Sequence, residues 1–265
     1  ICTDFHVYVF VISCLVLGSF SIFTYKHSER PAFTYILYYA LGYYAVGFQM
    51  LRHVMALSVL LFAYDYILER KWIRFIIIVL LASCFHSSAL IFLIAYPIAR
   101  VKINFKQWIA IIAIVAAVFL AKARVAGLVN SVIMGMDRYS RYSTSASQLS
   151  LMGAMILICI YVASFLFSYP LYKDDDELKI LLNMSVLSIA FMTMVTIVGE
   201  FHRISMFFGI YNTVLLPKAW KVYRVENRRL KAVYLLGMAA VFIAYFLLIG
   251  LNNYDLATYR FFWTD

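Results

Sequence analysis

The chain has 265 residues, 65% of them hydrophobic and only 14% charged, with a mean hydropathy of +0.87. Such an apolar composition excludes a water-soluble globular domain and indicates an all-α, polytopic integral membrane bundle, with residues 1–265 forming a single transmembrane domain. The net charge of +10 does not predict nucleic acid as a partner, because the basic residues lie in short loops that orient membrane spans. The four cysteines lack metal-ligand spacing, and we expect no disulfide.

Three apolar spans are predicted before the first strongly basic loop. Residues 5–24 form the first span. Residues 31–48 form a second, Tyr-rich span that starts at Pro31, and its two glycines allow a close helix contact or a turn. The third span runs from about residue 50 to residue 68.

Arg52 lies at the beginning of the third span. An arginine within a membrane segment costs roughly 2.5–3.5 kcal/mol on insertion scales, and it therefore suggests a functional site. Gln49, Arg52 and Ala56 have the spacing of one helix face, which we expect to contact protein rather than lipid. His53 points to a different face and is a weaker candidate.

Residues 72–99 could form one long span or two short helices that meet near His86. Charge favours two helices: a hairpin places 16 of the 23 Lys and Arg residues on one side of the membrane, whereas a single span divides them 11 to 12. Each arm is too short to cross about 30 Å alone. We therefore expect a broken or re-entrant hairpin buried in the bundle, with His86 at its turn.

The rest of the chain predicts further spans and two long loops. A polar loop over 122–150 falls on the outer side, and a basic loop over 218–231 falls on the inner side, against anionic lipid. With the two arms of the hairpin, the chain has about ten apolar segments. The spans predicted after the hairpin cover residues 107–121, 151–170, 180–198, 204–217 and 232–250.

Three consecutive aspartates, Asp174 to Asp176, begin the inner loop before the span at 180–198. Such carboxylates could bind Mg²⁺ with a diphosphate. Their spacing is not that of a helical DDxxD motif, so a solvated acidic turn is the better interpretation. We predict no metal site and no cofactor, because the histidines lack HxxxH-type ligand spacing.

The predicted topology gathers ionisable residues at the outer side of the membrane. Guanidinium groups offer forked donors to phosphate oxygens, and histidine or glutamate can move a proton near neutral pH. The pattern is typical of a site for a phosphorylated lipid. The gathered residues are Arg52, His53, His86, Arg138, Arg141, Glu200, His202 and Arg203.

Simpler roles stay open for several of these residues. Glu200 and Arg203 have i, i+3 spacing and could pair at a helix junction. We expect His202 to be exposed rather than catalytic. Arg138 and Arg141 could be ordinary surface charges.

The stretch from residue 48 to residue 99 resembles the core of the EpsG/Wzy family of bacterial polysaccharide polymerases. In that family an Arg-Gln pair opens an alanine-containing helix, and a Phe-His-x-Ser-Ala break follows a basic loop. His53 stands where the family has Gln. Arg203 before an aromatic helix and the Arg-Tyr-Ser-Arg-Tyr loop are also similar. Family members carry additional N-terminal spans, so we expect a truncated N-terminus. The matching residues are Arg52, Ala56, Phe85, His86, Ser88 and Ala89.

The resemblance implies polymerisation of undecaprenyl-diphosphate-linked oligosaccharide repeat units into O-antigen, capsule or exopolysaccharide. This glycosyl transfer would occur at the outer face of the bacterial inner membrane, with a lipid diphosphate as leaving group. Membrane lipid, a chain-length regulator and a flippase are the implied partners, besides the lipid-linked glycan.

Site roles follow from the same resemblance. It implies that Arg52 and Arg203 clamp the diphosphate, helped by Arg138 or Arg141. The base for the acceptor hydroxyl is either His86 or Glu200. The aromatic residues expected to contact sugar or the prenyl chain are Phe85, Phe201 and Tyr142.

Other functions also fit these residues. A flippase or transporter of lipid-linked glycans would use broken helices and central arginines. A membrane O-acyltransferase that modifies polysaccharide would use His86. A scaffold within an assembly complex would need none of this chemistry.

Overall fold

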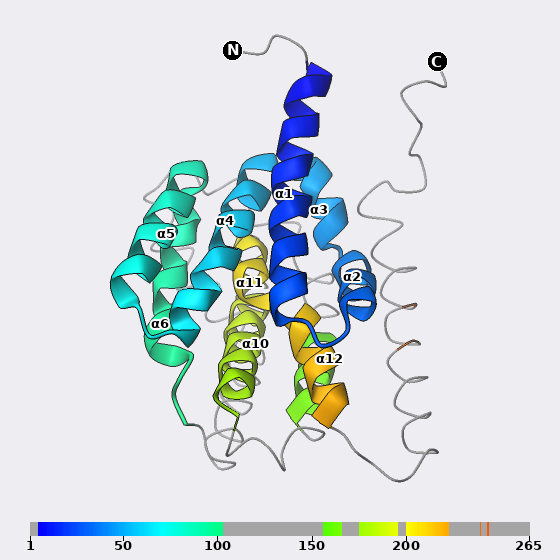
Figure 1. The fold of residues 1–265 in the computed structure, drawn as a ribbon, viewed down its shortest axis with the longest axis vertical. Helices are drawn as coiled ribbons and strands as arrows, with labels where there is room; N and C mark the ends of the chain where they lie inside the picture. Colours follow the sequence, from blue (N-terminus) through cyan, green and yellow to red (C-terminus); the bar gives the residue numbers. More distant parts are fainter. Residues whose placement is uncertain are drawn as a thin grey trace, which may run out of the picture.

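The computed structural model describes residues 5–102, 156–165, 175–195 and 200–222, with the single positions 239 and 243. Within these ranges the chain is helical and contains no strand, so the predicted all-α class is confirmed. A short helix covers Ile156–Phe165. The labelled elements of Figure 1 are α1 (Phe5–His27), α2 (Pro31–Ala40), α3 (Tyr43–Gln49), α4 (Leu51–Leu68), α5 (Trp72–Phe85), the 3₁₀ helix η1 (Ser87–Ile94), α6 (Ala95–Ile98), α10 (Asp176–Met194), α11 (Phe201–Gly209) and α12 (Asn212–Val222).

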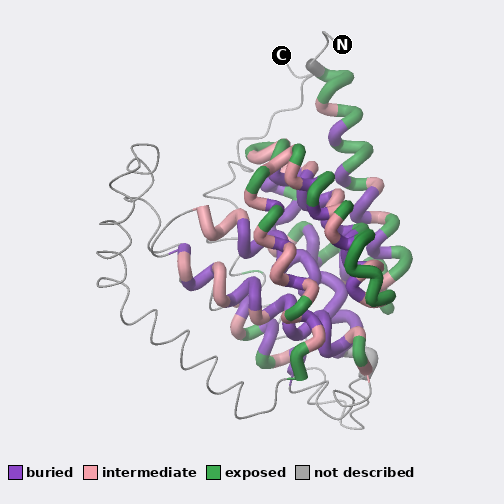
Figure 2. Tube along the Cα trace, turned by 90° about the vertical axis from the view of Figure 1, so that its left-hand side faces the viewer, coloured by how far each residue is buried: buried purple, intermediate pink, exposed green. Residues whose placement is uncertain are grey.

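Three of the described helices are long and apolar enough to cross a membrane, namely His6–His27, Leu51–Leu68 and Asp176–Met194. Helices α4 and α10 lie inside the bundle, whereas only 22% of the α1 span is buried. Figure 2 shows much of α1 as exposed, and apolar side chains can face outward where lipid surrounds them. The protein is therefore a membrane protein. The described part of the chain does not test the predicted total of about ten apolar segments.

Two predicted spans are each broken into two helices. Residues 31–48 form α2 and α3, because Gly42 adopts a left-handed φ of 80° that a helix cannot continue. The turn that the two glycines allowed is found at Gly42, and Pro31 begins α2 as expected. Residues 204–217 are likewise divided between α11 and α12, with Ile210 and Tyr211 at the break. Each of these two predicted spans thus consists of two short helices.

Pro217 lies inside α12 and links that helix to α2. Proline has no N–H, so the carbonyl of Thr213, four residues earlier, lacks its usual helical donor. The hydroxyl of Thr34 on α2 donates to this carbonyl at 3.1 Å, and both threonines are buried. A hydrogen bond between helices thus takes the place of the one that the proline removes.

The chain reverses at His86, where α5 ends and η1 starts back along it. Figure 1 shows α5 and α6 together at one edge of the bundle. Arg100, just after this return arm, donates to the carbonyl oxygens of Ile67 and Leu68, where α4 ends. Asn183 of α10 donates to three more carbonyls at the same end. The reversal predicted at His86 is confirmed, since the residues after the hairpin return to the level at which it began. The expected burial of the hairpin in the bundle is wrong, because the hairpin lies at an edge and Trp72, Ile77 and Leu81 of α5 are among its exposed apolar side chains.

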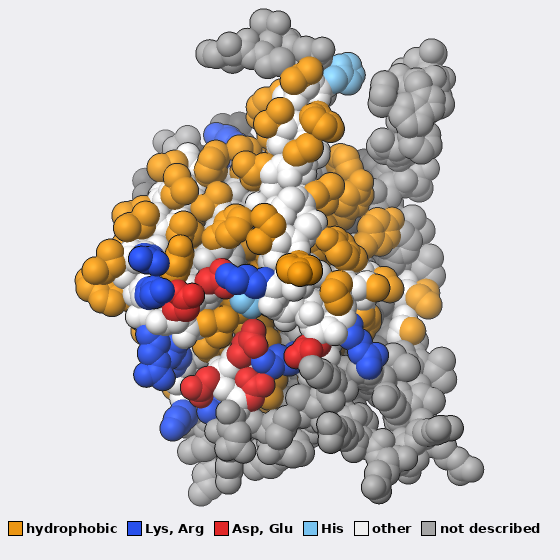
Figure 3. Space-filling model, in the orientation of Figure 1, with side chains coloured by type: hydrophobic (Ala, Val, Ile, Leu, Met, Phe, Trp, Pro, Cys, Tyr) orange, Lys and Arg blue, Asp and Glu red, His pale blue; other side chains and the backbone are white. Residues whose placement is uncertain are grey.

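An ion-pair network joins α1, α4, α10 and α12 at the end of the bundle where the hairpin begins and ends. Asp65 lies 2.6 Å from the Lys26 amine and 2.9 Å from Nε2 of His27. The other ring nitrogen of His27 is 3.6 Å from Glu177, which also pairs with Lys218. Figure 3 shows charged side chains gathered in the lower part of the visible face, below a mostly apolar surface. We call this end the charged end.

The acidic run before α10 belongs to this network. Asp175 caps α10 by accepting from the Leu178 N–H at 2.9 Å, and its carboxylate also lies 3.2 Å from Lys218. Asp176 pairs with Lys179 at 2.9 Å. The expected solvated turn is confirmed for Asp176, whose side chain is 72% exposed and pairs within α10. It is wrong for Asp175, which caps α10 and pairs with Lys218 of α12. Asp174 lies outside the described residues.

Candidate functional site

Six ionisable residues from three separate stretches meet at the opposite end of α4 from the charged end. Arg52 and His53 come from the first turn of α4, and His86 from the hairpin turn. The charges of Arg203, Glu200 and Arg52 act on the His86 imidazole. The charges of His86, Arg203 and His202 act in turn on the His53 imidazole. Since α4 has 18 residues, this group and the charged end are separated by roughly 27 Å.

His53 is the buried member of the group, with only 2% of its surface exposed. Its ring lies edge-on to His86, with centroids 5.5 Å apart, and packs on Phe207 of α11 at 4.5 Å. The sequence interpretation ranked His53 low because it assumed that Gln49 and Arg52 share a helix. That assumption is wrong: α3 ends at Gln49 and α4 begins at Leu51. His53 therefore faces the interior, whereas Arg52 is exposed.

Glu200 and Arg203 form the ion pair that their spacing allowed, with a distance of 2.7 Å between carboxylate and guanidinium. Both side chains are about one-third exposed (30% and 33%). A pair of this kind adds little stability, so its main effect is to orient the guanidinium. Arginine has five N–H donors, and the pair leaves donors for another anion.

The predicted aromatic contacts are only partly described. Phe201 stacks against Phe191 of α10 with centroids 6.1 Å apart, and Phe85 packs at the end of α5. Both are partly buried against the core. Their roles toward sugar or prenyl chain stay predictions. Three further predicted site residues lie outside the described ranges: Arg138, Arg141 and Tyr142.

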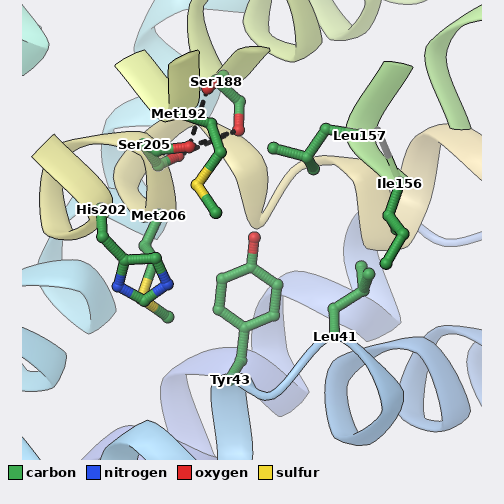
Figure 4. A pocket seen from close by; sticks show the side chains of 9 residues that line it. All are labelled: Leu41, Tyr43, Ile156, Leu157, Ser188, Met192, His202, Ser205 and Met206. Carbon is green, nitrogen blue, oxygen red and sulfur yellow. Dashed lines mark hydrogen bonds between the residues drawn. The ribbon is translucent and has the colours of Figure 1, made fainter. Parts of the chain in front are cut away.

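A small cavity of about 40 Å³ lies beside this group. Figure 4 shows the Tyr43 hydroxyl pointing into it, opposite the hydrogen-bonded serines Ser188 and Ser205. The volume has room for about three water molecules. The lining residues are Leu41, Tyr43, Ile156, Leu157, Ser188, Met192, His202, Ser205 and Met206.

His202 and Tyr43 show what sequence reasoning missed at this cavity. His202 was expected to be exposed, but it is half-buried and forms one wall. Tyr43 starts α3 directly after the Gly42 turn. Gly42 was the sequence signal for it, because a turn there directs Tyr43 into the bundle.

The chemistry of the group favours an anion over a cation. Across the described ranges, no three His, Cys, Asp or Glu side chains are close enough together to hold a metal ion. The guanidinium groups of Arg52 and Arg203 offer several donors suited to phosphate oxygens. Both also lie in the first turn of a helix, α4 and α11, where the helix dipole favours negative charge.

A helical membrane bundle with arginines, histidines and a glutamate gathered at one end defines a membrane protein with a cation-rich polar site. A family model described as the EpsG family matches residues 1–262, and the chain belongs to this family. No curated protein and no solved structure matches the chain. Membership confirms the resemblance found in the sequence and indicates a membrane protein of the polysaccharide polymerase type.

Proposed function

We propose that this protein polymerises undecaprenyl-diphosphate-linked oligosaccharide repeat units into O-antigen, capsule or exopolysaccharide. The observation that carries the proposal is the meeting of two arginines from separate helices at one histidine, in a member of the EpsG family. The reaction is a glycosyl transfer from a lipid diphosphate to a sugar hydroxyl of a second lipid-linked unit.

In this proposal, Arg52 and Arg203 bind the diphosphate of the donor. Negative charge on the diphosphate grows as the glycosidic carbon–oxygen bond breaks, and positioned donors stabilise that charge. The two residues approach from α4 and α11, so together they could clasp both phosphates. Arg138 and Arg141 are proposed to assist from the outer loop.

His86 is the better candidate for the base, because the Glu200 carboxylate is already paired with Arg203 at 2.7 Å. His86 ends a helix, is only partly buried, and lies where the chain reverses. It takes the proton of the acceptor hydroxyl as the new glycosidic bond forms. The lipid diphosphate leaves without a proton.

The proposed location is the outer face of the bacterial inner membrane. The charge count supports it, because the hairpin puts most Lys and Arg residues on the opposite, inner side. The donor and acceptor are then lipid-linked glycans in the outer leaflet, delivered by a flippase. A chain-length regulator is a further proposed partner.

The test is purified protein in liposomes with a lipid-diphosphate-linked repeat unit. We expect the wild type to lengthen the glycan and release lipid diphosphate. Arg52→Ala and Arg203→Ala should each lower the rate about 10²–10³-fold, because each removes a donor to the leaving group. The control is Arg74→Ala, an exposed arginine at the charged end, which should leave the rate unchanged.

Other outcomes would identify the rival functions. Movement of unchanged substrate across the bilayer, without longer product, would identify a flippase. Transfer of an acyl group to added polysaccharide would identify an acyltransferase. Wild-type polymer formation by Arg203→Ala would remove the proposed role of that residue.

A further inference from the structure

His53 is buried with both ring nitrogens unpaired. Only 2% of the residue is exposed, and neither Nδ1 nor Nε2 has a hydrogen-bond partner in the described part of the chain. A neutral imidazole carries one donor and one acceptor, and each buried group without a partner costs about 1–3 kcal/mol. This cost, within the candidate site, indicates that His53 gains a hydrogen-bond partner when the site is active.

The neighbours of His53 restrict what that partner can be. The ring rests on Phe207 at 4.5 Å, which fixes one face of it. The ionisable groups around it are His86 at the hairpin turn, Arg203 and His202 on α11, and Arg52 on its own helix. Arginine offers only donors, whereas His86 and His202 can both donate to an imidazole and accept from one.

The geometry favours His86. The His53 and His86 centroids are 5.5 Å apart, with ring planes at 89°. An N–H···N bond of about 2.9 Å between two imidazoles places their centroids roughly 5 Å apart. His86 follows the last residue of α5, has extended backbone angles, and is partly exposed, so its ring has room to turn. A small rotation of His86 is enough to close the bond.

We propose that His53 is the positioning residue of His86. A His53 ring nitrogen accepts a hydrogen bond from one ring N–H of His86. This bond fixes the His86 tautomer and aims its other nitrogen, unprotonated, at the acceptor hydroxyl. The inference rests on the proposed function, because it assigns a partner to the base of that reaction.

The proton balance is simple. The acceptor O–H proton moves to the free nitrogen of His86, while the new glycosidic bond forms and the bond to the diphosphate breaks. His86 then carries two N–H groups, one of them still bonded to His53. The proton stays on His86 until it is lost to solvent, so His53 holds the ring and carries no charge itself.

The first test reads the His86 ring without any reaction. The chain has five histidines, so ¹⁵N-histidine NMR in nanodiscs is tractable, with H86Q used to assign the signals. We expect the wild type to show one protonated and one unprotonated His86 nitrogen. H53F keeps a ring against Phe207 but has no acceptor, and it should move both His86 signals toward a tautomer average. H6F, which removes an exposed histidine of α1, should leave them unchanged.

The second test measures polymerisation. H53F should lower kcat about 10–100-fold with little change in KM, as expected when an orienting partner is lost. H53Q, whose amide oxygen can accept from His86, should retain most of the rate. Identical His86 signals in wild type and H53F would overturn the inference. So would equal kcat in wild type, H53Q and H53F. A wild type without polymerase activity but with the expected NMR shifts would overturn the proposed function and leave the histidine pair intact.

Discussion

At the scale of single residues, His86 and Glu200 differ in what surrounds them. Glu200 is held by a guanidinium on its own helical turn, whereas His86 lies at a reversal of the chain, beside the buried His53 and under the influence of the charges of Arg52 and Arg203. The two candidates for the base therefore have separable effects. In the proposed mechanism, Glu200 acts through the orientation of Arg203, and His86 acts on the acceptor hydroxyl.

Substituting each residue should separate binding from chemistry. His86→Gln should lower kcat by roughly 10²–10⁴-fold, the usual contribution of a positioned base, with KM nearly unchanged. Glu200→Gln should mainly raise KM, because Arg203 loses its orienting partner while the base is intact. Steady-state kinetics with a lipid-linked repeat unit measures both constants. A larger fall in kcat for Glu200→Gln than for His86→Gln would reverse the assignment.

At the scale of elements, the bundle uses hydrogen bonds between helices to repair interruptions within them. The clearest case is Pro217, whose missing N–H leaves the Thr213 carbonyl to the Thr34 hydroxyl. Proline inside a helix is costly, and here a neighbouring helix satisfies the freed carbonyl. This hydrogen bond holds α2 beside α12.

A double-mutant cycle tests the repair. Thr34→Val keeps the shape of the side chain but leaves the buried Thr213 carbonyl unpaired, which should cost about 1–3 kcal/mol. In the P217A background, a main-chain N–H can bond that carbonyl again, so the same change should cost less. Thermal unfolding in detergent gives both values. Equal costs in the two backgrounds would show that the proline and the threonine act independently.

How far the sequence predicts these elements depends on the kind of signal. Loop charge predicted the reversal at His86, because each arm moves a whole set of basic residues to one side or the other. Apolar content alone did not predict the breaks after Ala40 and Gly209, since short helices and long spans have the same composition. The role of His53 was missed for a related reason: a break at Met50 sets which face of α4 turns inward, and helical periodicity cannot detect it.

At the scale of the whole molecule, charge is divided between the two ends of the bundle. The charged end is an interlocked set of ion pairs across four helices, in which acids and bases neutralise one another. The opposite end has two arginines, three histidines and one paired glutamate among the described residues. The charged end thus joins helices to one another, and the cationic groups of the other end are the ones proposed to bind the lipid diphosphate.

Removing a base from the charged end should therefore destabilise the bundle without altering the site. Lys218→Met removes the amine that pairs with both Glu177 and Asp175, and since the Lys218 side chain is only 11% exposed, we expect a loss of roughly 1–3 kcal/mol. The matched control is Lys71→Met, whose pair with Glu69 is 47% exposed on each side and should contribute less than about 1 kcal/mol. Thermal unfolding in detergent compares them. Equal loss in the two variants would contradict a stabilising network.

The 3₁₀ geometry of η1 explains how a short return arm matches a longer outgoing one. Helix α5 has 14 residues, which at an α-helical rise extend roughly 21 Å. The return arm has 8 residues in η1 and 4 in α6. Its 3₁₀ part rises about 2.0 Å per residue, so the arm extends roughly 22 Å. Wound entirely as α-helix it would end about 4 Å short, and Arg100 would not reach the last carbonyls of α4. The larger rise per residue of η1 thus returns the chain to the level in the bundle at which α5 begins.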